Sequence, residues 1–223
     1  MEKRASGFTL IEIAIVLVII GLLLGGVLKG QELITSARVR NFIQQQDGVK
    51  AAYFGFLDRY RALPGDYRNA TDNIANIAIG LAACGGGNGN GDGTIISGAV
   101  VENILVWEHL SKAGFITGTY TCAAVAGAGT GPTNPYGQFL NLVFDANYAT
   151  AGGVSRHNLQ TGANVPSDIL AEVDRKVDDG NSVQGVFRAY GAIGGAGADC
   201  WVPGTGAWMV TTPRANCIAT TIF

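Results

Sequence analysis

The chain has 223 residues, which is enough for one domain of ordinary size together with a membrane anchor. Only 14% of the residues are charged, and 15 basic against 17 acidic side chains give a formal net charge of −2. Such a balance lacks the basic surface of a nucleic-acid-binding protein, so no nucleic-acid partner is expected.

The N-terminal segment is dominated by an apolar run from Phe8 to Leu28, in which almost all side chains are Leu, Ile, Val, Ala or Gly. A helix needs about 20 such residues to cross the hydrocarbon core of a bilayer. Glu12 is the single ionisable residue in the run. A carboxylate in lipid costs about 2.5–3.5 kcal/mol on insertion scales, so Glu12 is predicted to have a function.

Seven residues precede the apolar run, and they include Lys3 and Arg4. In an ordinary secretory signal the small residues of the cleavage site follow the apolar segment, whereas here the small residues 5–7 precede it. A peptidase that cut after Gly7 would leave the apolar segment on the mature protein, with Phe8 at its N-terminus. By the positive-inside rule, the two basic residues place the N-terminus in the cytoplasm and the rest of the chain beyond the membrane.

The stretch Gly7-Phe8-Thr9-Leu10-Ile11-Glu12, followed by an apolar helix, resembles the class III signal of type IV pilins and of the pseudopilins of type II secretion. The resemblance implies that a prepilin peptidase cuts after Gly7 and methylates the new amino group of Phe8. It also implies that Glu12 neutralises the N-terminus of an adjacent subunit as a filament grows.

The same resemblance implies a set of partners and a location. The partners are identical or related pilin subunits, the prepilin peptidase, an inner-membrane assembly platform and the membrane itself. The precursor would be a single-pass protein of the inner membrane with a periplasmic head. The mature protein would then reside in a pilus at the cell surface or in a periplasmic pseudopilus.

Apolar residues continue at helical spacing after the apolar run. Phe42, Val49 and Phe56 belong to one face of an amphipathic helix, and Pro64-Gly65 ends the pattern. The sequence therefore predicts one long helix, with a membrane-spanning first half and an amphipathic second half over residues 29–63.

The rest of the chain is predicted to form a globular head of the α+β class. We expect the second half of the long helix to pack on a small antiparallel sheet of about four strands. The domain boundaries are then 1–7 for the leader, 8–28 for the transmembrane and assembly helix, 29–63 for its amphipathic continuation, and 64–223 for the head. Expected helices in the head are 66–73, capped by Asp66, 101–112, and 167–176, capped by Ser167; expected strands are 115–121, 139–144, 185–190 and 207–211.

The loop Asn88-Gly89-Asn90-Gly91-Asp92-Gly93-Thr94 has the spacing of an EF-hand-type calcium loop. In such loops oxygen ligands alternate along the chain, and a glycine in the sixth place makes the sharp turn. Asn88, Asn90 and Asp92 would supply side-chain oxygens and Thr94 a main-chain carbonyl. The twelfth place, where an EF-hand loop has Glu, is Ala99 in this chain, so Glu102, three residues later, would supply the missing carboxylate. The alternative is a plain turn whose glycines adopt positive φ.

The four cysteines permit three disulfide connectivities. Export beyond the membrane favours disulfides, because the periplasm and the cell surface are oxidising. We expect Cys84 to pair with Cys122 and Cys200 with Cys217, because this pairing keeps both closed loops local.

No catalytic constellation is evident, so the chain is not expected to be an enzyme. His109 and His157 lack the spacing of metal ligands, and a structural role is favoured for His109. Trp201, Trp208 and Tyr190 are either core residues, which is the favoured interpretation, or an exposed adhesive surface.

The sequence thus favours a structural subunit of a type IV pilus-like filament. A type II secretion pseudopilin is one alternative. The resemblance implies that major pseudopilins hold calcium in a loop of the head, so the calcium-like loop favours this alternative. A membrane-anchored surface binding protein that does not polymerise is another alternative.

Overall fold

The computed structural model describes residues 10–148, 153–191 and 198–223. The chain forms two compact units, one ending at Arg38 and the other running from Val39 to Phe223. Helix α1 (Leu10–Tyr60) contributes to both units. The long helix predicted from the apolar and amphipathic patterns is therefore confirmed over its described length.

The N-terminal unit presents an apolar helical surface. Every side chain from Leu10 to Lys29 is exposed in this chain. The segment meets the length and composition of a membrane span. A continuous apolar surface of this extent is stable in water only when lipid or protein covers it.

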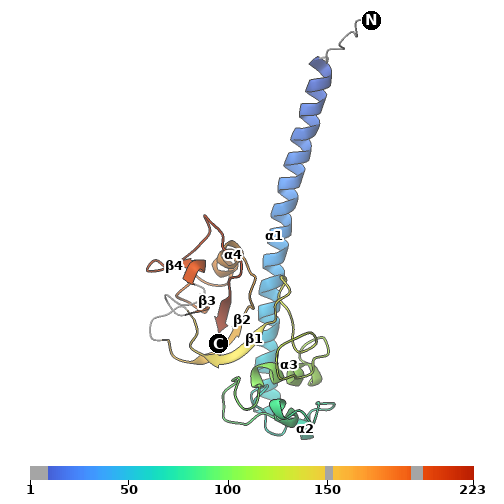
Figure 1. The fold of residues 1–223 in the computed structure, drawn as a ribbon, viewed down its shortest axis with the longest axis vertical. Coiled ribbons are helices and arrows are strands. Elements are labelled where there is room, and N and C mark those ends of the chain that lie inside the picture. The colour runs from blue at the N-terminus through green and yellow to red at the C-terminus, as the bar shows by residue number, and fades with distance from the viewer. Residues whose placement is uncertain (1–9, 149–152, 192–197) are drawn as a thin grey trace, which may run out of the picture. The chain divides into compact units, whose positions relative to one another are not determined.

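The second unit contains a four-stranded antiparallel sheet in the order β1-β2-β6-β3, with a separate two-stranded hairpin formed by β4 and β5. The chain is α+β, as expected (Figure 1). The strands are β1 (Asn141–Asp145), β2 (Arg156–Gln160), β3 (Phe187–Ala189), β4 (Trp201–Val202), β5 (Ala207–Trp208) and β6 (Ala219–Ile222). The helices are α2 (Ala70–Asn73), α3 (Glu102–Lys112) and α4 (Ser167–Val177), with 3₁₀ turns η1 (Ala82–Gly87) and η2 (Ala198–Cys200).

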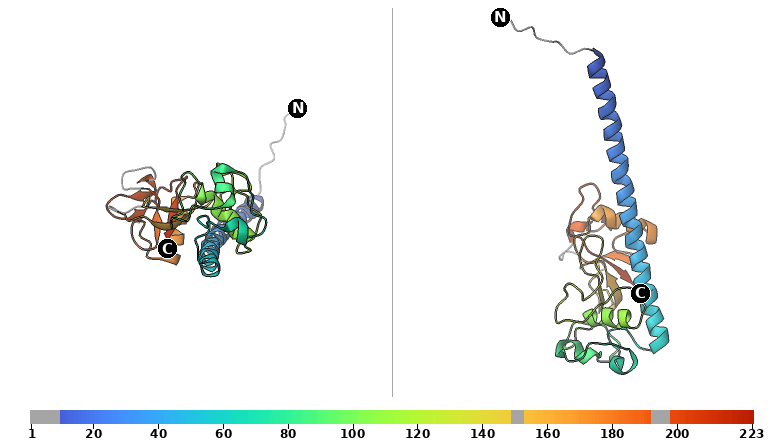
Figure 2. Two further views of the ribbon diagram at one scale, coloured as in Figure 1. Left: turned by 90° about the horizontal axis from the view of Figure 1, so that it is seen from below. Right: turned by 90° about the vertical axis from the view of Figure 1, so that its right-hand side faces the viewer.

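The part of α1 that belongs to this unit contributes to two buried clusters. Phe42 packs in a cluster with residues of α4, β3 and the C-terminal hairpin, among them Trp201 and Trp208. Phe56 packs in a second cluster with residues of α3, β1 and β2. Figure 2 shows the strands and α3 beside residues 39–60 of α1 from two further directions. Burial of these apolar faces is the main term that holds the helix to the sheet.

Two central strands of the sheet were not expected from the sequence. Strand β2 reads Arg-His-Asn-Leu-Gln, and its polar members Asn158 and Gln160 are buried, with both side-chain amides donating hydrogen bonds to Asp145. In β6, the Thr221 hydroxyl donates to Gln46 of α1 at 3.1 Å. These strands hold polar groups inside the fold, so they lack the apolar alternation on which strand prediction depends.

The expected strand at 115–121 was wrong. Gly114 and Gly118 adopt φ of +81° and +105°, which bends the backbone out of the extended conformation. Phe115, Ile116 and Tyr120 instead pack against the cluster around Phe56. The apolar residues that suggested a strand are thus buried by an irregular segment.

The two expected helix caps were also wrong. Asn69, and not Asp66, precedes α2. Ser167 is the first residue of α4, and its hydroxyl donates to the Met209 carbonyl at 2.5 Å and accepts from the Arg214 N–H at 2.8 Å. Both side chains find tertiary partners that local sequence does not reveal.

Candidate functional site

The predicted processing site lies at the N-terminal end of the apolar segment. Gly7 and Phe8 are outside the described residues. Glu12 lies in the first turn of α1 and is exposed among Leu, Ile and Val side chains. A carboxylate in the first turn is favoured by the helix dipole, while an apolar environment around it raises the cost of its charge.

The glycine loop forms a second candidate site. The structure brings the predicted ligands Asn90, Asp92 and Thr94 together but bonds Asn88 elsewhere. Asn88 does not face the loop interior: its side-chain oxygen accepts the Thr71 N–H at 3.0 Å, and its amide donates to the Thr71 hydroxyl at 3.1 Å. Asn90 and Thr94 both bond to Asp92. The Asn90 oxygen accepts the Asp92 N–H at 2.8 Å, and the Thr94 hydroxyl donates to the Asp92 carboxylate at 2.7 Å.

Asp66, which was not among the predicted ligands, places its carboxylate in the loop, whereas the predicted ligand Asn88 is bonded elsewhere. One carboxylate oxygen accepts the Gly91 and Asp92 N–H groups at 2.5 and 3.1 Å, and the other accepts the Gly93 N–H at 2.9 Å. Asp66 precedes the loop by about 25 residues in the chain, and no motif connects the two. Only the tertiary fold could reveal this contact.

Glu102 closes the loop from the first turn of α3. Its carboxylate accepts the Asn90 N–H at 2.9 Å and the Ile96 N–H at 3.3 Å, and the side chain is fully buried. The pKa of Glu102 is raised to about 7, mainly because burial disfavours the charged carboxylate. The two hydrogen bonds lower the pKa, and the negative charges of Asp66 and Asp92 raise it.

The carboxylates of Asp66, Asp92 and Glu102 each offer an oxygen within 4.8 Å of the others. Three carboxylates this close repel one another, and hard cations such as Ca²⁺ prefer oxygen donors of this kind. The donor set therefore fits a divalent cation. It differs from an EF-hand, because Asp66 supplies an oxygen from outside the loop and Asn88 is bonded elsewhere.

His109 has a structural role, as favoured from the sequence. Its Nδ1 accepts the Gly65 N–H at 2.9 Å, so its Nε2 carries the proton and donates to the Gly87 carbonyl at 3.0 Å. The ring is stacked on Phe56 at 6.1 Å between centroids. Trp201 and Trp208 are buried and Tyr190 is half-buried, so the first two belong to the core and not to an adhesive surface.

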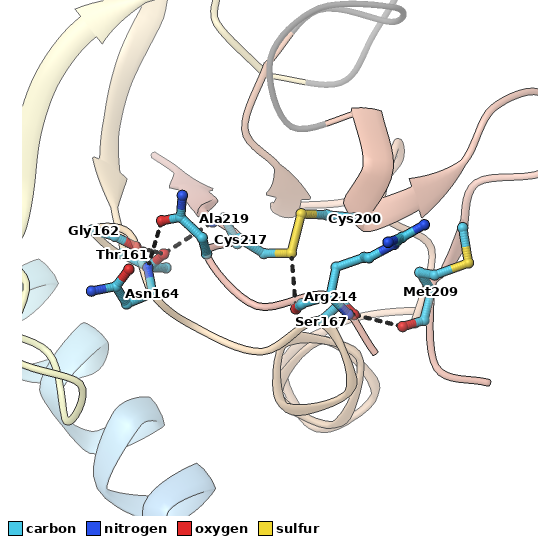
Figure 3. The surroundings of a disulfide bond; sticks show 10 residues. Thr161, Gly162, Asn164, Ser167, Cys200, Met209, Arg214, Cys217 and Ala219 are labelled. Carbon is cyan, nitrogen blue, oxygen red and sulfur yellow. Dashed lines mark hydrogen bonds between the residues drawn. A yellow bond between two sulfur atoms is a disulfide. The ribbon is translucent and has the colours of Figure 1, made fainter. Parts of the chain in front are cut away.

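Both predicted disulfides are confirmed. Cys84 is joined to Cys122, which links η1 to the segment after α3. Cys200 is joined to Cys217 and closes a segment that contains the β4–β5 hairpin. Figure 3 shows Ser167 and Arg214 beside this second bond. The two bonds fix the irregular parts of the head, where regular secondary structure is sparse.

Comparison with known proteins gives one finding. Residues 3–28 match the family described as Prokaryotic N-terminal methylation motif, which is the class III prepilin signal of type IV pilins and pseudopilins. No curated protein and no solved structure matches the chain. The N-terminal segment therefore carries a prepilin signal, and the match does not extend to the head.

Proposed function

We propose that this protein is a structural subunit of a type IV pilus-like filament. The observation that carries the proposal is the prepilin signal at residues 3–28, which continues into an exposed apolar helix. Proteins with this signal are of a structural, pilin-like kind. Partners of the same kind would cover the apolar helix in a filament, as lipid would cover it in the precursor.

In this proposal a prepilin peptidase cuts the precursor between Gly7 and Phe8 and methylates the amino group of Phe8. Lys3 and Arg4 hold the leader in the cytoplasm, and the head lies in the periplasm. The two disulfides of the head support an oxidising compartment. An inner-membrane assembly platform would then extract the cut subunit from the membrane.

Glu12 is proposed to pair with the Phe8 amino group of a neighbouring subunit. Inside a bundle of apolar helices the attraction between the two charges is less screened than in water. Pairing with a cation also offsets the cost of a charged carboxylate among apolar side chains. The pair would therefore set the position of each incoming helix.

The test compares Glu12→Ala with Glu32→Ala. Glu32 is a matched control, because it lies on the same helix beyond the apolar run and is exposed beside Lys29, 2.7 Å away. We expect Glu12→Ala to be processed and inserted normally but to be nearly absent from sheared filaments, and Glu32→Ala to assemble at the wild-type level. A wild-type yield of filaments from Glu12→Ala would contradict the pairing. Absence of the wild-type protein from any filament would favour the non-polymerising surface protein.

A secretion pseudopilin is a second candidate, and the carboxylate cluster of the glycine loop favours it. We propose that Asp66, Asp92 and Glu102 bind Ca²⁺, with Asn90 and Thr94 as further oxygen donors. The ion would offset the repulsion between carboxylates and tie the loop to α3. Localisation separates the two roles, because a pilus subunit is recovered from the cell surface and a pseudopilin from the periplasm.

A further inference from the structure

The glycine loop contains two Asn-Gly dipeptides with the same immediate neighbours, in the run Gly87-Asn88-Gly89-Asn90-Gly91. Asn-Gly is the dipeptide in which the backbone nitrogen can most readily attack the preceding side-chain amide, because glycine has no Cβ to obstruct ring closure. The run therefore holds two chemically equivalent sites that differ only in their surroundings in the fold.

Charged groups hold both ends of the peptide unit that joins Asn90 to Gly91. The Gly91 N–H donates to the Asp66 carboxylate at 2.5 Å. The Asn90 carbonyl accepts from the Arg68 guanidinium, whose Nε lies 3.0 Å away. The guanidinium draws electron density from the peptide and makes its N–H more acidic, and the carboxylate is placed to accept the proton.

The side-chain amide of Asn90 is activated as well. Its oxygen accepts the Asp92 N–H at 2.8 Å, which stabilises negative charge as it develops on that oxygen. Its nitrogen donates to the Asp92 carboxylate at 2.9 Å, a bond that holds the amide in place and does not itself activate it. Both partners belong to the same exposed turn, so the side chain is not tied to a distant element.

The Asn88-Gly89 site differs in that its side chain is bonded to a distant element and its peptide N–H to an uncharged group. The Asn88 amide is bonded to Thr71 of α2 through both its oxygen and its nitrogen. The Gly89 N–H donates to the neutral carbonyl of Tyr67 at 3.0 Å. Gly89 is buried so tightly that a Cβ there would lie 2.3 Å from the Asp66 backbone. Ring closure at this site would have to break contacts that hold the loop to the head.

We propose that Asn90 is a site of self-modification, at which the chain converts this residue to aspartate or isoaspartate. The Gly91 nitrogen forms a bond to Asn90 Cγ and gives up its proton toward Asp66. The bond from Cγ to the amide nitrogen then breaks, and the nitrogen leaves as ammonia with that proton. Water opens the resulting succinimide at either carbonyl. The net change is the uptake of one water and the release of one ammonia.

The product alters the acidic cluster of the loop. A carboxylate at position 90 cannot donate to Asp92, and it adds a negative charge next to Asp66, Asp92 and Glu102. Modification therefore increases the repulsion between carboxylates when the loop is empty and adds a carboxylate oxygen donor when the loop holds a cation.

The test follows both dipeptides in one sample. The full-length chain in non-ionic detergent, with a chelator to remove divalent cations, is incubated near neutral pH and digested with trypsin. Fragmentation of the peptide that contains both residues then gives the rate of conversion at each. We expect Asn90 to convert faster than Asn88 by about tenfold or more in the folded chain. In denaturant the two rates should become equal.

Two variants test the cause. Arg68→Gln changes an exposed side chain and should slow conversion of Asn90 by about tenfold or more, because one preorganised donor to a reacting peptide is lost. Asn90→Gln should abolish the product at that position. Equal rates at Asn88 and Asn90 in the folded chain would overturn the proposal, as would an unchanged rate in Arg68→Gln. Faster conversion in denaturant than in the fold at Asn90 would overturn it as well.

Discussion

His109 connects three separate parts of the head, so its replacement is a sensitive test of the fold. Its ring bonds the turn at Gly65 to the glycine loop at Gly87 and stacks on Phe56 of α1. His109→Phe preserves an aromatic ring but leaves a buried N–H and a buried carbonyl without partners. Each such group costs about 1–3 kcal/mol, so we expect a loss of about 2–6 kcal/mol in the free energy of unfolding near pH 7.

The same side chain predicts a pH dependence with a definite sign. Burial lowers the pKa of His109 from 6.5 to about 4. Between these two pH values His109 is protonated in the unfolded chain and neutral in the folded chain, so lowering the pH destabilises the fold. The loss is about 1.4 kcal/mol per pH unit, or about 3 kcal/mol across the window. Because His109→Phe lacks this proton, its deficit relative to wild type should shrink as the pH falls from 7 to 4.

Urea denaturation of the full-length chain in non-ionic detergent measures both effects. The three tryptophans lie buried in the head, so their fluorescence reports on its unfolding. For the loss near pH 7, His157→Phe is the matched control, because Nε2 of His157 has no hydrogen-bond partner among the described residues and its removal should cost little. The reasoning would be refuted if His109→Phe cost less than about 1 kcal/mol near pH 7. A deficit that stayed constant or widened toward pH 4 would refute the pH argument.

Three further predictions concern other parts of the head. Burial raises the pKa of Asp174 to about 6, although the Trp208 N–H donates to its carboxylate. Between about pH 4 and 6 the folded chain holds a proton that the unfolded chain has lost, so the free energy of unfolding falls as the pH rises through this range. In urea titrations Asp174→Asn should therefore gain stability relative to wild type over that range. Replacing both Cys200 and Cys217 by serine should lower the free energy of unfolding by about 3 kcal/mol, as the chain-entropy model gives for a closed loop of this size; a loss under 1 kcal/mol would refute this. Calcium should raise the melting temperature of the wild-type chain and leave that of Asp92→Ala unchanged, and equal melting of the wild type in calcium and in chelator would reduce the loop to a plain turn.

The features of this chain that depend on local pattern could be predicted from the sequence. The long helix follows from an apolar run and a helical periodicity, and α3 ends before Gly114, as expected. The disulfide pairing also followed from spacing, since each closed loop is local. In these cases the determining residues are close together in the chain.

The features that depend on distant contacts could not be predicted. Strands β2 and β6 carry buried polar side chains. Asn158 of β2 donates to Asp145 of β1 and accepts from the Thr220 hydroxyl of β6, and Thr221 of β6 donates to Gln46 of α1. The glycine loop was recognised, yet Asp66 reaches it only through the tertiary fold. Asn88 fits the ligand spacing, but its side-chain oxygen accepts the Thr71 N–H, so spacing alone predicted one ligand that is bonded outside the loop.

The central claim is that the precursor is cut after Gly7 and that the apolar helix remains on the mature protein. Intact-mass measurement of the protein from cells with and without a prepilin peptidase tests it most directly. With the peptidase we predict a chain that begins at a methylated Phe8; without it, and in Gly7→Val, the chain should begin at Met1. Ser6→Ala is the control and should be cut normally. A wild-type protein that still begins at Met1 in the presence of the peptidase would contradict the account.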